Sequence, residues 1–259
     1  MMKSICIEML GLEVDFYERI ALAKSHGFDM VEFWGWEGKD IPRIASLCQT
    51  HGVSVSSISG DGPYSLCDDS HMAEYIRYAE QSMLVAKQLG CPVCVIHSNA
   101  LGEGGVVLDH YTQFSRTRLF MNMLRTLSQL APIAEKHGIV LTLEALNTSY
   151  DHQGNALYTT ADSVELVRLV DSPFVKVLYD VYHMQITEGD ILNTITRFIA
   201  DIGHVHIADV PGRHEPGTGE INYPAVWQCL RDNGWKGAVG FELSAAGTFE
   251  DAVRAIGAL

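Results

Sequence analysis

One local pattern recurs along this chain and constrains its fold more than any other feature of the sequence. A stretch with helical character ends at a glycine or another turn residue, and a short apolar or β-branched run follows at once. Gly52, Gly90 and Gly138 mark three such junctions. Glycine accepts the left-handed conformation that closes a helix, and β-branched runs favour strands. The chain is therefore expected to alternate helix and strand.

Counting these junctions predicts eight strands, near residues 4–9, 28–33, 53–55, 91–96, 139–143, 175–179, 204–207 and 237–241. Helical patterns lie between and after them, near residues 15–26, 40–51, 70–89, 112–137, 160–171, 189–200, 222–233 and 247–258. Each repeat takes about 32 residues, close to the size of one strand–helix–strand unit.

The strand segments are mostly continuous apolar runs, as expected where both faces of a parallel sheet are buried. Eight such repeats predict one (β/α)8 barrel domain over residues 1–259, with its active site on the loops that follow the strands. The competing open, doubly wound sheet would need a glycine-rich phosphate loop after its first strand. Residues 9–12 read Met-Leu-Gly-Leu and contain no such motif.

Charge and composition exclude several classes of partner. The chain has 18 Lys and Arg against 32 Asp and Glu, a formal net charge of −14, which argues against binding a nucleic acid. No run of 18 apolar residues predicts a membrane span, and Glu8 interrupts any signal-peptide-like start. Six scattered cysteines do not resemble a secreted disulfide scaffold. A cytoplasmic protein is expected.

Four neighbouring strands of the predicted barrel, the fifth to the eighth, each end in a side chain that can bind a metal ion. These residues are Glu144, Asp180, His206 and Glu242, separated by 36, 26 and 36 residues. The barrel brings the ends of its strands to one rim, where three carboxylates would repel one another without a cation. Carboxylate oxygens with one imidazole suit a divalent ion such as Mn²⁺, Mg²⁺ or Co²⁺.

Other polar residues are candidates for contacts with a substrate. His183 lies three residues beyond Asp180, and Arg213 stands in the long loop 209–220, where its planar fork would match a carboxylate or adjacent oxygens. Glu8, Glu32 and His97 end strands one, two and four. Each of these side chains also has a structural interpretation, as a cap, an internal ion pair or a solvated loop residue.

Two segments resemble a known family. Residues 180–186, Asp-Val-Tyr-His-Met-Gln-Ile, together with the strand-end ligands, resemble the xylose isomerase-like TIM barrel superfamily of sugar isomerases and epimerases. Residues 210–216, Val-Pro-Gly-Arg-His-Glu-Pro, and 219–223 look like the hydroxypyruvate isomerase family. The resemblance is strongest over residues 139–243.

By this resemblance Glu144 and Glu242 are the acid–base pair and also metal ligands, while Asp180 and His206 complete the metal site. His183 and Arg213 would then hold substrate oxygens. The resemblance implies a small sugar or hydroxy-keto acid as substrate, converted by proton transfer through an enediolate, as in the isomerisation of hydroxypyruvate to tartronate semialdehyde. It also implies a homo-oligomer, a dimer or a tetramer.

The chain departs from that family at two places. Hydroxypyruvate isomerases often carry glutamine where this chain has His206, and histidine there is similar to the ketose 3-epimerases. They also often have two arginines just after the last glutamate, where residues 243–247 read Leu-Ser-Ala-Ala-Gly. Both departures favour a neutral ketose and a 3-epimerase as the alternative, although Tyr150 stands near where epimerases tend to place a further glutamate.

Two more remote functions use the same fold. Three-zinc DNA-repair endonucleases also have an Asp-x-x-His step, which Asp180 and His183 match, but they need more imidazoles on the earlier strands than His97 supplies. A non-catalytic sugar-binding barrel would tolerate the loss of either glutamate.

Overall fold

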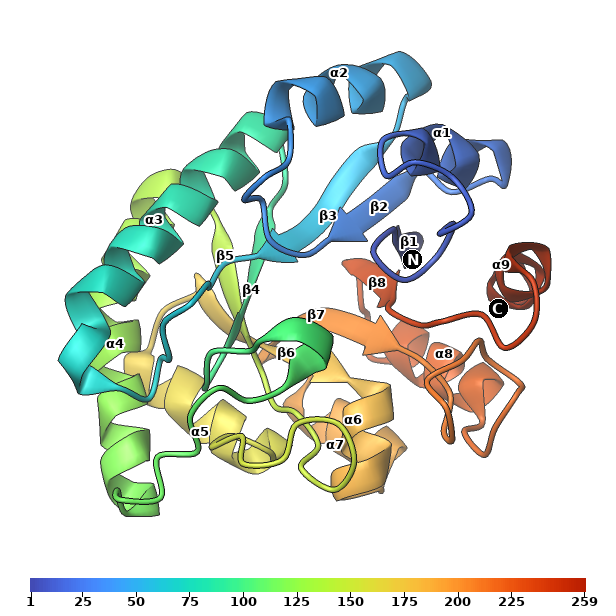
Figure 1. Ribbon diagram of the computed structural model, residues 1–259. Helices are drawn as coiled ribbons and strands as arrows, with labels where there is room; N and C mark the ends of the chain where they lie inside the picture. Colours follow the sequence, from blue (N-terminus) through green and yellow to red (C-terminus); the bar gives the residue numbers. More distant parts are fainter.

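Eight parallel strands pair in chain order and close into a barrel in the computed structural model, which describes all residues 1–259 (Figure 1). The strands are β1 (Met2–Cys6), β2 (Met30–Phe33), β3 (Ser54–Ser59), β4 (Val93–His97), β5 (Val140–Glu144), β6 (Val175–Asp180), β7 (Ile202–Ile207) and β8 (Ala238–Phe241). Closure comes from β1 pairing with β8, with Met2 opposite Ala238. The predicted (β/α)8 TIM barrel is confirmed.

Helices surround the barrel (Figure 1). They are α1 (Glu18–Ser25), α2 (Ile41–His51), α3 (Met72–Leu89), α4 (Arg116–His137), α5 (Thr160–Val170), α6 (Val181–Thr187), α7 (Ile191–Phe198), α8 (Tyr223–Asp232) and α9 (Phe249–Gly257), with 3₁₀ turns η1 (Asp69–His71) and η2 (Glu103–Gly105). No helix is both long and apolar enough to cross a bilayer.

The repeating glycine junction works as expected from the sequence. Gly52, Gly90 and Gly138 end α2, α3 and α4 with φ of 64°, 66° and 70°, and a β-strand follows each of them within a few residues. Side chains also fix the helix starts: Ser115 and Thr159 each accept a hydrogen bond from a backbone N–H in the first turn of α4 and α5.

Two of the differences from the predicted elements bear on the site. The first strand ends at Cys6 rather than Met9, because the chain turns there and the Leu10 N–H donates to the Cys6 carbonyl at 3.0 Å. A short helix, α6, starts directly after β6, where the sequence suggested only a loop before the next helix. Asp180 therefore both ends a strand and caps a helix.

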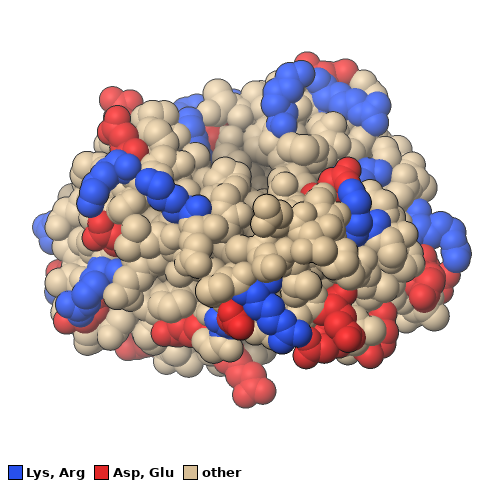
Figure 2. All heavy atoms as spheres, turned by 90° about the horizontal axis from the view of Figure 1, so that it is seen from above, with Lys and Arg blue, Asp and Glu red and all other residues tan.

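Buried polar side chains lie in the middle of several strands as well as at their ends; Ser4, in the middle of β1, shares a buried hydrogen bond with Ser56 on β3 at 2.6 Å. Among the buried polar residues are Glu32, Ser57, Glu144, His204 and His206. Acidic and basic side chains alternate around the edge of the face in Figure 2, and the middle of that face carries few of them. The buried polar residues of the strands and their ends thus form the surroundings of the site.

Candidate active site

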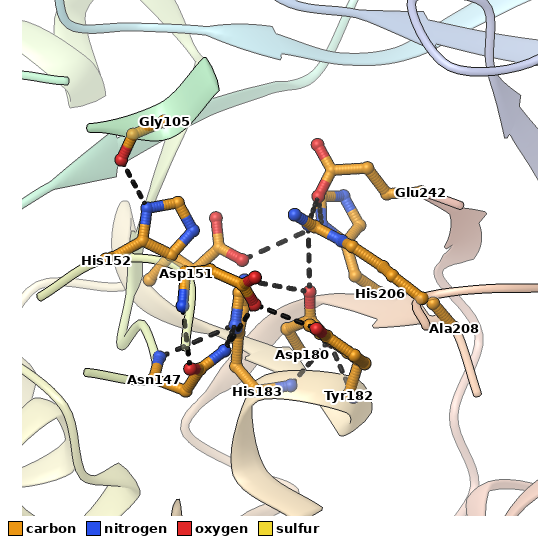
Figure 3. Close-up of polar contacts among 12 residues, drawn as sticks. Gly105, Asn147, Asp151, His152, Asp180, Tyr182, His183, His206, Ala208 and Glu242 are labelled. Carbon is orange, nitrogen blue, oxygen red and sulfur yellow. Dashed lines mark hydrogen bonds and ion pairs between the residues drawn. The ribbon is translucent and has the colours of Figure 1, made fainter. Parts of the chain in front are cut away.

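Four predicted ligands gather at one point inside the rim of the barrel (Figure 3). Each of Glu144, Asp180, His206 and Glu242 offers one ligand atom, and these atoms all lie within 4.8 Å of one another. His206 Nδ1 lies 3.6 Å from Glu242 Oε2 and 3.9 Å from Glu144 Oε1. The four side chains come from the ends of β5 to β8, so the periodicity of the barrel brings them together.

Asp180 is oriented by the start of α6. Its Oδ1 accepts hydrogen bonds from the N–H groups of Tyr182 and His183 at 2.7 and 3.2 Å, which leaves Oδ2 to face the cluster. Burial raises the pKa of Asp180 to about 7; the Arg213 guanidinium lowers it in part, and the Glu144 carboxylate raises it further. The three carboxylates therefore lie so close together that Arg213 and His206 do not fully offset their repulsion at Asp180.

Glu144 is held by polar groups from β4 and from the loop after β3. The predicted substrate contact His97 uses both ring nitrogens here: Nε2 lies 3.0 Å from Glu144 Oε2, and Nδ1 lies 3.2 Å from Asp61 Oδ2. Burial alone would lower the pKa of His97, but the carboxylates of Asp61 and Glu144 raise it. His97 therefore supports Glu144 and has no free ring nitrogen for a substrate.

His206 is held from the opposite side by Glu32, on β2. Glu32 Oε1 lies 3.3 Å from His206 Nε2, and its Oε2 lies 3.1 Å from His204 Nε2. The hydroxyls of Ser56 and Ser57 donate to the same Oε2 at 3.2 and 3.1 Å. Because one ring edge of His206 faces Glu32, the other edge, with Nδ1, faces the metal-ligand cluster.

The Glu32 carboxylate fits only because residue 240 on β8 lacks a side chain. A β-carbon on Gly240 would lie 2.3 and 2.5 Å from the two carboxylate oxygens. Burial would raise the pKa of Glu32, but the charge of His206 and the hydrogen bond from His204 outweigh it and lower that pKa. The raised pKa of His206, about 10, has the same origin: burial lowers it, and Glu32 and Glu242 raise it more.

Glu242 is bracketed by two donors. The Trp34 indole N–H donates to Oε1 at 2.7 Å, and the Arg213 guanidinium donates to Oε2. Arg213 also lies 3.7 Å from Asp180 Oδ2 and rests over the Tyr182 ring, 5.3 Å from its centroid. The predicted contact of Arg213 with a substrate stays a prediction, and its buried Nε has no partner in the protein.

The loop that carries Arg213 is shaped by one buried acid, Asp209. Its two oxygens accept four hydrogen bonds, from the backbone N–H groups of residues 210, 217, 219 and 221, at 2.9–3.1 Å. Gly219 is required at its position, because a β-carbon there would lie 2.0 Å from the Val210 carbonyl oxygen. Asp209 therefore folds the long loop back over the rim.

His183 is fully buried beside the cluster, and a hydrogen bond from Asn147 determines its tautomer. The Asn147 side-chain oxygen accepts from the N–H groups of Tyr150 and Asp151, so its NH₂ group faces His183 Nδ1 at 2.8 Å. Nδ1 must accept that bond, and Nε2 therefore carries the hydrogen. This N–H points to the site, 3.6 Å from Asp180 Oδ2.

The remaining predicted contact, Glu8, lies in the turn after β1 and is paired with Lys39 at 2.9 Å. It is outside the four-residue cluster, and its contact with a substrate stays a prediction. Glu32, His204 and Trp34 have structural roles that the sequence reasoning did not assign. One signal was present for His204: it stands two residues before His206, on the same face of the strand.

The residues present fit a divalent cation. Glu144 Oε1 and His206 Nδ1 are buried and have no hydrogen-bond partner in the protein, although such groups are normally satisfied. Both belong to the cluster of three carboxylates and one imidazole. A hard or borderline divalent ion prefers this set of donors.

Comparison with known proteins agrees with this architecture. The family model described as xylose isomerase-like TIM barrel matches residues 20–258. The chain belongs to this family. Within the xylose isomerase-like barrels it is 38% identical over 237 residues to a 2-oxo-tetronate isomerase of Cupriavidus necator, covering 91% of this chain and 90% of that protein.

Hydroxypyruvate isomerase of Escherichia coli is 28% identical over 257 residues, covering 96% of this chain and 95% of that enzyme. Among solved structures, an AP endonuclease of family 2 from Brucella melitensis superposes with a TM-score of 0.87 at 28% identity, covering 98% and 97% of the two chains. The resemblance to the hydroxypyruvate isomerase group is confirmed, and the chain is an enzyme of the isomerase type.

Proposed function

We propose that this protein is a divalent-metal-dependent isomerase of short hydroxy-keto acids. It would convert hydroxypyruvate to tartronate semialdehyde, or catalyse the corresponding isomerisation of 2-oxo-tetronate. The observation that carries the proposal is the convergence of Glu144, Asp180, His206 and Glu242 within 4.8 Å. Both named relatives are isomerases of acids of this class.

The same four residues would hold the metal ion, with Mn²⁺, Mg²⁺ and Co²⁺ as candidates. When bound, the ion would supply a positive charge that stabilises the enediolate formed when a proton leaves the carbon next to a carbonyl. It would also relieve the crowding of acids that raises the pKa of Asp180.

Glu144 and Glu242 are the proposed groups that move the proton. His97 contacts Oε2 of Glu144 and lowers the pKa of that carboxyl against the effect of burial, so the carboxylate stays ionised and can act as a base. Glu242 follows β8 directly and belongs to the same cluster, and it would exchange a proton with the opposite face of the substrate. Both carboxylates are buried, which protects the reactive intermediate from water.

Substrate oxygens would be held by Arg213 and His183. The Arg213 Nε–H and the His183 Nε2–H are buried and have no partner in the protein. An arginine fork matches a carboxylate group, which supports an acid as substrate even though residues 243–247 lack the arginines common in relatives.

A ketose 3-epimerase is the second candidate. His206 favours it, because histidine at this position is similar to that branch. The two reactions share the enediolate and differ in where the proton returns: to the neighbouring carbon in isomerisation, and to the other face of the same carbon in epimerisation.

The three-zinc endonuclease and the non-catalytic sugar-binding barrel are less well supported. His97 is committed to Glu144 and Asp61, so it is not free to join a zinc cluster. A binding protein, in turn, would have no need for two glutamates with distinct partners. Cleavage of abasic DNA and sugar binding without turnover are the outcomes that would favour these alternatives.

The test is incubation of the metal-loaded protein in D₂O with hydroxypyruvate, 2-oxo-tetronate and short ketoses. NMR reports both the position of deuterium and the configuration of the product. Glu242→Gln is expected to keep the fold and lose about 10²–10⁴-fold in rate. Glu80→Gln is the matched control, because Glu80 pairs with His137 on the outer helices. Near-normal turnover in Glu242→Gln would contradict the two-glutamate assignment.

A further inference from the structure

His152 is a buried histidine near the site for which the proposed chemistry has no use. It lies in the loop between β5 and α5, with 6% of its surface exposed. Its backbone is tied on both sides, since its N–H donates to the Asn147 carbonyl at 3.1 Å and its carbonyl accepts from the Asn155 N–H at 3.0 Å. The ring therefore has a defined position and is not a mobile loop side chain.

One hydrogen bond determines the tautomer of His152. Its Nδ1 lies 2.7 Å from the Gly105 carbonyl oxygen, which can only accept, so Nδ1 carries the hydrogen. Burial lowers the pKa of His152 and keeps the ring neutral. Nε2 is then an acceptor, and it is buried without any partner in the protein.

The loop at Gly105 is built to make this contact. A β-carbon on Gly105 would lie 2.7 Å from His152 Cε1, so only glycine lets the backbone approach the ring this closely. Figure 3 shows the free edge of the His152 ring turned away from Gly105 and toward the carboxylates of the site. The unpartnered acceptor therefore faces the site.

His183, next to His152, offers a hydrogen-bond donor where His152 offers an acceptor. The two rings pack edge to face, with their centroids 5.2 Å apart. Since Asn147 donates to His183 Nδ1, the Nε2–H of His183 is a donor, and it is also without a partner. One buried donor and one buried acceptor thus stand side by side at the edge of the site.

We propose that His152 and His183 together bind a hydroxyl group of the substrate beyond the two reacting oxygens. A hydroxyl accepts from His183 and donates to His152, whereas a carboxylate or keto oxygen can only accept and would leave His152 unsatisfied. This inference rests on the proposed isomerase function and narrows its substrate class. The preferred substrates carry a further hydroxymethyl group, as 2-oxo-tetronate does and hydroxypyruvate does not.

Two variants of His152 separate hydrogen bonding from loop shape. In His152→Asn the side-chain NH₂ can replace Nδ1–H at Gly105, but nothing replaces Nε2. In His152→Gln the longer amide can place its oxygen near the position of Nε2. The ratio of kcat/KM for 2-oxo-tetronate over hydroxypyruvate is measured for the wild type and both variants, with Mn²⁺ bound.

The ratio is expected to favour 2-oxo-tetronate in the wild type, to fall about tenfold in His152→Asn, and to be largely kept in His152→Gln. An unchanged ratio in His152→Asn, or an equal loss in both variants, would overturn the proposal. Dissociation constants of both acids, measured by calorimetry in a Glu242→Gln background, give the same comparison without turnover. If the wild type converts neither acid, the proposed function fails, and the binding ratio still decides whether the hydroxyl site exists.

Discussion

Replacing Glu32 by glutamine removes the one negative charge that faces both His204 and His206, while nearly preserving the volume of the side chain. In the metal-free protein the pKa of His206 is raised from 6.5 to about 10, and Glu32 is the largest favourable cause. A shift of that size corresponds to about 5 kcal/mol of linked stability. Glu242 and Glu144 also contribute to it, so we expect Glu32→Gln to lose about 3 kcal/mol near pH 6.5.

The pH dependence gives the sign of the effect. A histidine whose pKa is higher in the folded state stabilises the fold fully below its unfolded pKa, and this stability is lost as pH rises through the folded pKa. The deficit of Glu32→Gln should therefore be largest near pH 6.5 and shrink toward pH 10.

The assay is urea unfolding with a chelator present, at several pH values between 6.5 and 9.5. Glu80→Gln is again the control: Glu80 is paired with His137 at 3.0 Å on the outer surface, and its loss should cost no more than about 1 kcal/mol. Equal free energies of unfolding for wild type and Glu32→Gln at every pH would refute the reasoning, because His206 would then not depend on Glu32 for its charge.

Three further outcomes follow from the same geometry. Gly240→Ala places a β-carbon 2.3 Å from Glu32 Oε1 and should weaken Mn²⁺ binding about 10–100-fold in a fluorescence titration; unchanged affinity would contradict the account of His206. Mn²⁺ binding at pH 7.5 should release about one proton, from His206, and heats that do not vary among buffers of different ionisation enthalpy would argue against it. Asp209→Asn breaks part of the loop that holds Arg213 and should lower kcat/KM about 10–100-fold, whereas wild-type kinetics would show that the loop does not depend on Asp209.

The barrel could be predicted from the sequence because its signals are local and repeated. Gly52, Gly90 and Gly138 close helices by backbone conformation alone, and no distant contact is needed to recognise them. The four candidate ligands at the strand ends could be predicted for the same reason, because closure of the barrel brings the strand ends to one rim. The short helix α6 was missed because Asp180 ends a strand and caps a helix with no intervening turn residue.

Contacts across the barrel had no comparable signal. Glu32 and His206 are far apart in the chain, and their pairing depends on strand register and on the absence of a side chain at Gly240. His97 was expected to contact a substrate, but its ring pairs with Asp61 instead. Asp61 lies in the loop before α3, and no local sequence pattern predicts the direction of its side chain. His152 lies in a loop, so its place near the site could not be predicted from the residue spacing of a helix or strand.

The two halves of the barrel contribute differently to the site. All four proposed metal ligands come from β5 to β8, yet Glu32, Trp34 and His97, from the first half, each contact one of them. Substitutions among the first hundred residues can therefore alter the charge and orientation of the ligands without removing any. Evolution could thus tune the preference for a metal or a substrate in one half of the gene while the chemical groups in the other half stay constant.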